Sequence, residues 1–307
     1  MKILFAGTPE VAVPALQTLL DSGNEVVGVL TRPDVPLGRK KVMTASPIAQ
    51  LAESKKIPVI KATKITDEVL QELTSFDADL AVVVAYGALI PQKTLAAIEN
   101  GWINIHFSLL PKYRGAAPAQ RAIMAGDTKT GVSIFELEAG MDTGPLYAQW
   151  EVELHDDITS GELLETLAED STDKLLEVIG DIAAGKKPKP QTGEATKADK
   201  LTIEDAHIDF NKEARLVQRQ INGVTPEPGA WALLDEKRFK IHKSKISVEN
   251  NNLAAGKLEF IAKKPAKLLV GAATGPLELL EVQPFGKKRM NATDYARGAD
   301  LTNKVLT

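Results

Sequence analysis

The segment Ala78–Gly87 (ADLAVVVAYG) is the feature that most constrains how this chain can fold. It is almost entirely apolar and rich in β-branched residues, which is the pattern of a strand buried on both faces of a sheet. Four other apolar segments of strand type accompany it: KILFAG (2–7), EVVGVLT (25–31), IPVI (57–60) and WINIHFS (102–108). Helix-like stretches separate them, and strands alternating with helices at this spacing predict a parallel, doubly wound sheet.

The rest of the chain changes in character along its length. Residues 131–154 contain two strand-like runs around AGMDTG, predicted as a hairpin-like appendage, and residues 160–184 have the apolar pattern of a long helix. Residues 185–200 are rich in Gly, Pro and Lys and are predicted to link two domains. After a helix at 213–223, short strand-like runs divided by Gly, Pro and Asn predict a small barrel.

Composition excludes several classes of site. The 307 residues are enough for two domains, and they include no Cys and only four His. Disulfide frameworks, thiolate zinc sites and a Cys nucleophile are therefore excluded, and no metal is expected. The apolar run at the N-terminus is too short for a signal peptide, and no apolar run is long enough to span a bilayer, so a cytoplasmic protein outside the membrane is expected.

Charge is distributed unevenly. Residues 1–205 carry a formal net charge of −10 and residues 206–307 one of +6, which together give −4. This asymmetry predicts that the second part meets a polyanion, although surface composition alone could produce it. A basic segment, Arg39-Lys40-Lys41, lies in a predicted long loop after the second strand, where it could clamp a phosphate backbone or be a solvated charge run.

Asn104 and His106 are the most informative polar pair. They are two residues apart in the fifth strand, so their side chains share one face at the carboxyl edge of the sheet, where ligands bind in open α/β folds. An amide donor beside an imidazole suits an oxyanion that forms when a carbonyl is attacked. The alternative is a polar pair that satisfies nearby backbone groups.

Asp142 is the only carboxylate in a tight loop bounded by Gly140 and Gly144. Close to His106 it would favour the imidazolium form, and the alternative is a turn Asp that bonds its own backbone. The first strand–helix turn, by contrast, has Gly7 but lacks the second and third glycines of a dinucleotide-binding fingerprint. An NAD-dependent dehydrogenase is therefore disfavoured.

Together these segments resemble the methionyl-tRNA formyltransferases over essentially the whole chain. The resemblance is carried by FAGTPE, TRPDVPLGRKK, VVVAYG, INIHFSLLPKYRGAAPAQRAI, GVSIFELEAGMDTG and TPEPGAW. The SLLP–RGAAP stretch and the MDTG loop are typical of the wider folate-dependent formyltransferases, and the two-domain length favours the tRNA enzymes among them. Departures from the family pattern are Thr225-Pro226-Glu227-Pro228 in place of Asn-Pro-Trp-Pro, and Tyr113 in place of Trp.

The resemblance implies a Rossmann-like, mostly parallel catalytic domain (1–185), a linker (186–205) and an OB-like β-barrel domain that binds tRNA (206–307). It implies that a monomer transfers the formyl group of 10-formyltetrahydrofolate to the α-amino group of methionine on initiator tRNA. The implied site residues are Asn104, His106 and Asp142 for catalysis, Ser108, Leu109, Leu110 and Pro111 for folate, and Arg39, Lys40 and Lys41 for tRNA. In the expected mechanism Asn104 and a protonated His106 hold the formyl oxygen, while Asp142 keeps the imidazole charged.

Two other classes of function remain open at the level of the sequence. One is a related formyltransferase that acts on a small amine, such as a nucleotide-sugar amine or glycinamide ribonucleotide, and the basic C-terminal part argues against it. The other is a noncatalytic RNA-binding protein that has kept an enzyme fold, and the complete set of Asn104, His106 and Asp142 argues against that one.

Overall fold

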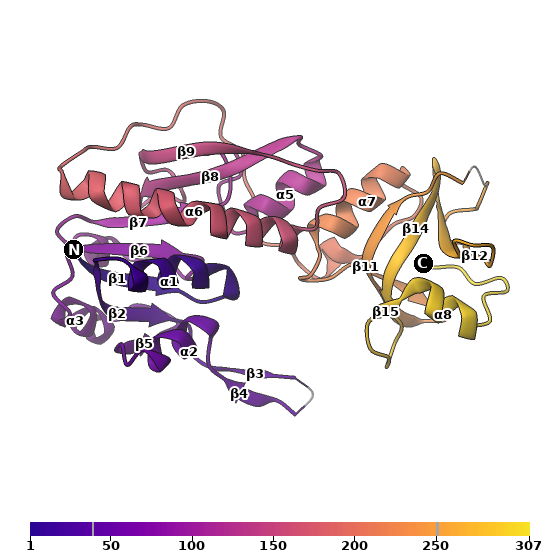
Figure 1. Cartoon of the computed structure of the whole chain (residues 1–307), viewed down its shortest axis with the longest axis horizontal. Coiled ribbons are helices and arrows are strands. Elements are labelled where there is room, and N and C mark those ends of the chain that lie inside the picture. Colours follow the sequence, from indigo (N-terminus) through magenta and orange to yellow (C-terminus); the bar gives the residue numbers. More distant parts are fainter. Residues whose placement is uncertain (39, 250–251) are drawn as a thin grey trace. The chain divides into compact units, whose positions relative to one another are not determined.

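The computed structural model describes residues 1–38, 40–249 and 252–307 of the chain (Figure 1). These residues form two compact units, each assembled from separate segments of the sequence. Unit 1 contains Met1–Pro118, Thr130–Val152 and Leu164–Ala198, and unit 2 contains Ala119–Lys129, Glu153–Leu163 and Asp199–Thr307. The three consecutive segments expected from the sequence as domain, linker and domain remain a prediction about how the chain is organised.

The sheet of unit 1 has seven strands in the order β5-β2-β1-β6-β7-β8-β9. Their bounds are β1 (Lys2–Gly7), β2 (Glu25–Thr31), β5 (Val59–Lys61), β6 (Leu80–Val84), β7 (Trp102–His106), β8 (Lys129–Glu136) and β9 (Leu146–Glu153). Neighbours from β5 to β7 are parallel, which confirms the predicted sheet. All five residues of β6 are buried, as its apolar sequence predicts.

The two strands predicted within residues 131–154 are present as β8 and β9, but the prediction that they form an appendage is wrong, because they extend the main sheet beyond β7. Strand β8 pairs antiparallel with β7 and sets Phe135 opposite Asn104 and Ser133 opposite His106. Phe135 and Ser133 are fully buried, so the run that looked like a separate hairpin belongs to the core around the candidate site.

Residues 10–183 also contain helices, and several of these begin at a residue suited to a helix N-terminus. They are α1 (Val13–Asp21), α2 (Pro47–Ser54), α3 (Asp67–Ser75), α4 (Gln92–Leu95), α5 (Pro118–Ala125) and α6 (Ser160–Ala183), with a 3-10 turn η1 (Glu10–Ala12) before α1. Helix α1 begins only at Val13, after η1, and Pro14 lies in its first turn, where proline is tolerated. Ser46 and Thr66 cap α2 and α3 by accepting hydrogen bonds from the first turn of each helix.

Unit 2 contains an antiparallel sheet in the order β10-β11-β14-β13-β12, with β15 paired to β14. The strands are β10 (Trp231–Leu234), β11 (Lys237–Ile246), β12 (Leu258–Ile261), β13 (Lys267–Ala272), β14 (Gly275–Gln283) and β15 (Met290–Asn291). Helices α7 (Ala214–Gly223) and α8 (Ala292–Gly298), together with the turn η2 (Glu204–Ala206), complete this part. The predicted C-terminal β domain is thereby confirmed, and its sheet is antiparallel.

The last residues of the chain bond to both ends of this path of strands. The Leu306 N–H donates to the Gly256 carbonyl beside β12 (2.8 Å), and the Thr307 N–H donates to the Leu233 carbonyl in β10 (2.9 Å). A short C-terminal segment, not a regular strand pair, therefore connects the two edges of the predicted OB-like sheet.

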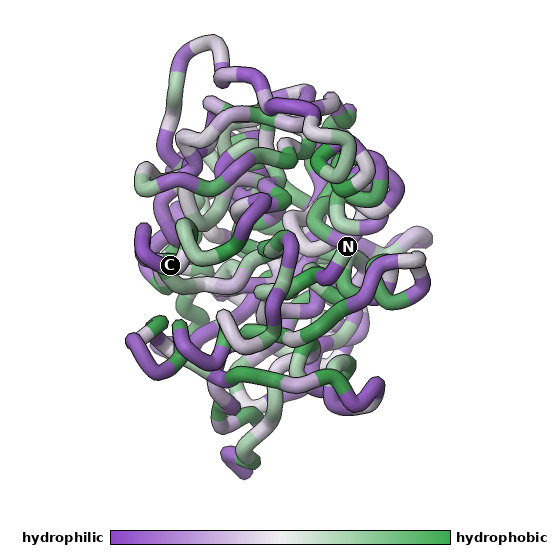
Figure 2. Tube along the Cα trace, turned by 90° about the vertical axis from the view of Figure 1, so that its left-hand side faces the viewer, coloured by the Kyte–Doolittle hydropathy of each residue, from purple (hydrophilic) through white to green (hydrophobic). Residues whose placement is uncertain are grey.

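Hydropathy alternates along the trace, with hydrophobic stretches (green) separated by hydrophilic ones (purple), as Figure 2 shows. Each unit buries its apolar stretches in a core of its own, around Leu4, Ala81 and Trp102 in unit 1 and around Phe239 and Val270 in unit 2. Within the residues that the structure describes, no helix combines the length and apolarity needed to cross a membrane.

Candidate functional site

The carboxyl ends of three parallel strands meet where the strand order of unit 1 reverses. The first strand, β1, lies between β2 and β6, and β6 is followed by β7. The Thr8 hydroxyl, just after β1, donates to the Tyr86 carbonyl just after β6 (2.9 Å) and accepts from the Arg32 N–H after β2 (3.3 Å). Ligands bind at this position in open α/β sheets, so a site is expected at this edge.

Asn104 and His106 project from β7 at this edge. They alternate with the buried apolar Ile103 and Ile105, so both lie on the same face of the sheet, as predicted. Asn104 is half-buried, and its side chain has no hydrogen-bond partner among the residues that the structure describes. Its amide is therefore available to a ligand.

His106 is held in place by its surroundings. Only 5% of the residue is exposed, and the ring of Phe135 meets the imidazole edge-on with centroids 6.3 Å apart. Nε2 lies 2.9 Å from the Tyr113 carbonyl, which can only accept, so we assign the proton to Nε2. Nδ1 then faces Asp142 and is the nitrogen open to chemistry.

Asp142 comes to the same place from the loop after β8. Its Oδ2 accepts from the Gly115 N–H (2.7 Å) and lies 3.8 Å from His106 Nδ1. Asp142 has a φ of 52°, and Gly144 follows where a Cβ would collide with the Glu136 carbonyl. The structure thus brings Asn104, His106 and Asp142 together, and the carboxylate bonds another segment of the chain, not its own turn.

Burial determines the charge state of the imidazole. Loss of water around His106 lowers its pKa below the ordinary value, and it outweighs the opposing effects of the Asp142 carboxylate and the Tyr113 carbonyl. The neutral ring is therefore favoured in this structure. This differs from the protonated His106 of the sequence-based mechanism, because desolvation depends on packing that residue types do not reveal.

Most of the residues expected to contact folate, at positions 108–111, are buried within the protein. The Ser108 hydroxyl donates to the Lys112 carbonyl (2.7 Å), and Ser108 and Leu110 are 0% and 2% exposed. Pro111 is also buried, whereas Leu109 is half-buried. Of the four residues, Leu109 thus offers the most side-chain surface to a ligand, and folate contact by this stretch stays a prediction.

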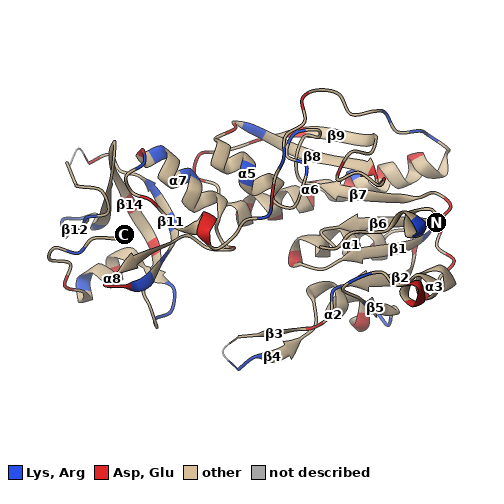
Figure 3. Ribbon diagram, turned by 180° about the vertical axis from the view of Figure 1, so that it is seen from behind, with Lys and Arg blue, Asp and Glu red and all other residues tan. Residues whose placement is uncertain are grey.

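Of the basic residues expected to contact tRNA, Lys40 and Lys41 lie in the turn of a hairpin, not in a long loop. Strands β3 (Val35–Leu37) and β4 (Val42–Thr44) pair antiparallel and form a sheet of their own. Lys40 and Lys41 are exposed in the turn, and Arg39 lies outside the described residues. Figure 3 shows the blue of Lys and Arg at this hairpin and along β11.

Three contributors to the site were not predicted: the Tyr113 carbonyl, the Gly115 N–H and the Gln191 side chain. The first two are backbone groups, which leave no mark in residue type, although both lie in the PKYRGAAP motif. Gln191 bonds the loop of Asp142 from within the predicted linker, whose composition gave no reason to expect a structural role.

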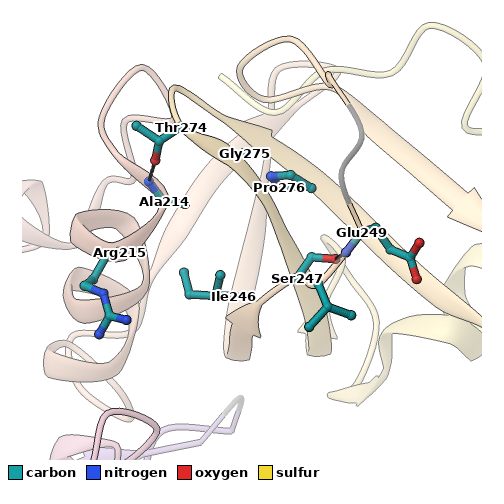
Figure 4. A pocket seen from close by; sticks show the side chains of 9 residues that line it. Ala214, Arg215, Ile246, Ser247, Glu249, Thr274, Gly275 and Pro276 are labelled. Atoms are coloured by element: carbon teal, nitrogen blue, oxygen red, sulfur yellow. Dashed lines mark hydrogen bonds between the residues drawn. The ribbon is translucent and has the colours of Figure 1, made fainter.

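A cavity of about 400 Å³ in unit 2 contains none of the predicted site residues (Figure 4). Two of its polar groups are used locally, since Thr274 accepts from the Ala214 N–H at the start of α7 (3.0 Å) and Ser247 accepts from the Glu249 N–H (3.1 Å). It offers no catalytic arrangement comparable to that around His106. Within the part of the chain that the structure describes, no group of three His, Asp or Glu is arranged to hold a metal ion.

Titration of His106 tests the electrostatics of this site. Followed by NMR, its midpoint should lie below the ordinary value of about 6.5, because burial disfavours the charged ring. Asp142→Asn should lower it further, since this carboxylate is the largest influence that raises it. Because the pKa of His106 is lower in the folded than in the unfolded native chain, the unfolded chain binds more protons as the pH falls. The contribution of His106 to stability is therefore complete above about pH 6.5 and is lost as the pH falls towards the folded pKa.

His106→Gln assigns the resonance by removing it. A midpoint at or above the ordinary value in the native protein, or no change in Asp142→Asn, would contradict this description.

Comparisons with known proteins agree with the two-part structure. The family model described as "Formyl transferase" matches residues 1–179, and that described as "Formyl transferase, C-terminal domain" matches residues 200–300. A methionyl-tRNA formyltransferase of Renibacterium salmoninarum is 45% identical over 307 residues, which is 100% of this chain and 99% of that protein.

Two solved structures share the fold. HypX from Aquifex aeolicus in complex with tetrahydrofolic acid has a TM-score of 0.67 at 17% identity, over 97% of this chain and 47% of that one. WlaRD, a sugar 3N-formyl transferase, has a TM-score of 0.67 at 20% identity, over 94% of this chain and 99% of that one.

Proposed function

This chain belongs to the formyl transferase family, and from that premise we propose that it transfers a formyl group from 10-formyltetrahydrofolate to the α-amino group of methionine on initiator tRNA. The products are formyl-methionyl-tRNA, which serves translation initiation, and tetrahydrofolate. The observation that carries this proposal is the contact of Asp142 with His106, which shares one face of β7 with Asn104 at the carboxyl edge of the sheet. A methionyl-tRNA formyltransferase that is 45% identical matches this chain along its whole length.

The folate supplies a formyl group on N10, and the protein must stabilise charge and move one proton. Asn104 suits the first task, because its amide is half-buried and has no partner among the described residues. A hydrogen bond from this amide to the formyl oxygen, as the amine attacks, would stabilise the negative charge that develops there.

His106 suits the second task. A neutral ring with its proton on Nε2 has an accepting lone pair on Nδ1, so it can take the proton that the attacking amine loses. The carbon–N10 bond then breaks, and the same proton leaves Nδ1 for N10. Asp142 lies 3.8 Å away and stabilises the imidazolium that exists between these two transfers.

Charge supports a tRNA acceptor. Strand β11 of unit 2 has the sequence KRFKIHKSKI, and the β3–β4 hairpin of unit 1 exposes Lys40 and Lys41. Lysine and arginine side chains neutralise the charge of phosphates, and the release of condensed counterions from the nucleic acid favours this binding. Both surfaces therefore suit a polyanion. We assign catalysis to residues 1–185 and tRNA binding to residues 206–307, in a monomer that acts in the cytoplasm.

Replacing Asn104 tests the oxyanion role. In single-turnover transfer at saturating substrates, Asn104→Ala should lose about 10²–10³ in rate, the usual effect of removing one donor. Asn104→Asp, which keeps the shape but removes the donor, should fall by at least as much. Near-full rates in both variants, with folding and folate binding intact, would refute this assignment.

Neutralising the hairpin tests tRNA recognition. Lys40→Ala combined with Lys41→Ala should weaken tRNA binding. The slope of the logarithm of the affinity against the logarithm of the salt concentration should become shallower by about one for each phosphate that the protein no longer neutralises. Lys55→Ala combined with Lys56→Ala is a matched control, because this exposed pair lies in the turn after α2 and is not part of the hairpin. An unchanged salt slope in the hairpin variant, or equal effects in both variants, would remove the hairpin from the proposal.

A further inference from the structure

We propose that residues 189–198, called the strap here, form a positioning element of the active site, and that Gln191 is the residue through which it acts. This inference rests on the proposed function, because it assigns Gln191 an effect on Asp142. The strap lies in the region whose composition predicts a linker, yet its backbone is paired. Lys189 exchanges two hydrogen bonds with Leu146 (2.6 and 2.8 Å).

Further along the strap the pairing continues on the segment that follows β7. The Arg114 N–H donates to the Thr196 carbonyl (2.8 Å), and the Ala198 N–H donates to the Arg114 carbonyl (2.7 Å). The Thr196 hydroxyl accepts from the Tyr113 N–H (2.8 Å). The strap therefore bonds the backbone of Tyr113 and Arg114, directly beside the Tyr113 carbonyl and the Gly115 N–H that hold His106 and Asp142.

Gln191 uses both ends of its side-chain amide. Its Nε2 donates to the carbonyls of Asp142 (2.9 Å) and Gly144 (2.7 Å), and its Oε1 accepts from the Arg114 guanidinium (2.6 Å). One side chain thus joins the loop of the catalytic carboxylate to the segment that carries Gly115. Because Gln191 acts on the reacting groups only through Asp142, it is a positioning residue.

The loop needs such a partner. Asp142 has a φ of 52°, a left-handed conformation that costs free energy in L-residues, although less in Asp and Asn than in most others. Gln191 bonds its main-chain carbonyl while the Gly115 N–H bonds its carboxylate (2.7 Å). Asp142 is therefore held at both ends, and loss of either bond lets the carboxylate move relative to His106.

Gly115 makes the strap and the site interdependent. It has a φ of 127°, and a Cβ at this position would lie 2.6 Å from the Ala198 carbonyl of the strap. The strap thus packs directly on the residue whose N–H holds Asp142. Arg114 contributes through its bond to Gln191, and its Nε is buried without a partner among the described residues. Among the residues that the structure describes, the guanidinium is therefore directed by the Gln191 oxygen and forms no ion pair with a carboxylate.

Two variants of Gln191 separate its donors from its acceptor. Gln191→Ala removes every bond, and Gln191→Glu keeps an oxygen for Arg114 but has no donor for the two loop carbonyls. Both should lower the single-turnover rate by about 10-fold to 100-fold, as expected when a catalytic group is misplaced by about 1 Å, with little change in KM for the folate. Thr192→Ala, at the exposed neighbouring position of the strap, should keep the native rate.

The titration of His106 gives a readout that needs no substrate. In Gln191→Ala the NMR midpoint should move towards that of Asp142→Asn, because the displaced carboxylate no longer raises the pKa. In the Asp142→Asn background, Gln191→Ala should lower the rate little further, since both changes act on one interaction. An unchanged midpoint, or rate reductions that multiply fully in the double variant, would overturn the role of Gln191.

Failure of this inference is distinguishable from failure of the proposed function. If the native protein transfers no formyl group to tRNA, the proposed function fails, and the titration arm still tests whether Gln191 positions Asp142. If transfer occurs and Gln191→Ala behaves like Thr192→Ala in both measurements, the proposed function stands and the inference falls.

Discussion

The hydrogen bond from the Gly115 N–H to the Asp142 carboxylate is the interaction on which the site depends. It is 2.7 Å long and joins segments 27 residues apart. The Asp142 side chain is only 14% exposed, so without this donor a mostly buried charge would lose its hydrogen-bond partner. Bonds to charged groups contribute about 1.5–3 kcal/mol, enough to hold the carboxylate beside the buried imidazole. The conformation of Gly115 and the strap packed on it both serve this one interaction.

Most of the fold could be predicted from the sequence, because the pattern of apolar and polar residues within a segment indicates whether that segment forms a strand or a helix. Apolar β-branched runs predicted β1, β2, β5, β6 and β7, and the alternation of side chains along β7 set Asn104 and His106 on one face. The same reasoning failed for residues 131–154, because whether a strand pair stands apart or joins a sheet is decided by distant partners. Asp142 could be placed near His106 only through the family resemblance.

Contacts made by backbone groups and by an inconspicuous linker could not be foreseen. The Tyr113 carbonyl directs the His106 ring, and burial favours a neutral imidazole whose Nδ1 can accept a proton. The sequence-based mechanism has a charged ring because the family resemblance places Asp142 near His106, whereas residue types do not show how much water is excluded. The role of Gln191 could not be predicted for a related reason. It lies in a segment rich in Gly, Pro and Lys, which is the composition of a flexible linker, and its three hydrogen bonds form only in the folded chain.

The most direct test of the central claim is a transfer assay on the native protein and on His106→Ala. Each is incubated with 10-formyltetrahydrofolate and either initiator Met-tRNA, elongator Met-tRNA or a nucleotide-linked amino sugar. We expect formyl-methionine on initiator tRNA with the native protein, and a rate at least about 10²-fold lower with His106→Ala, because a positioned proton acceptor usually contributes this much. Formylation of the amino sugar without formylation of tRNA, or a native rate in His106→Ala, would contradict the central claim.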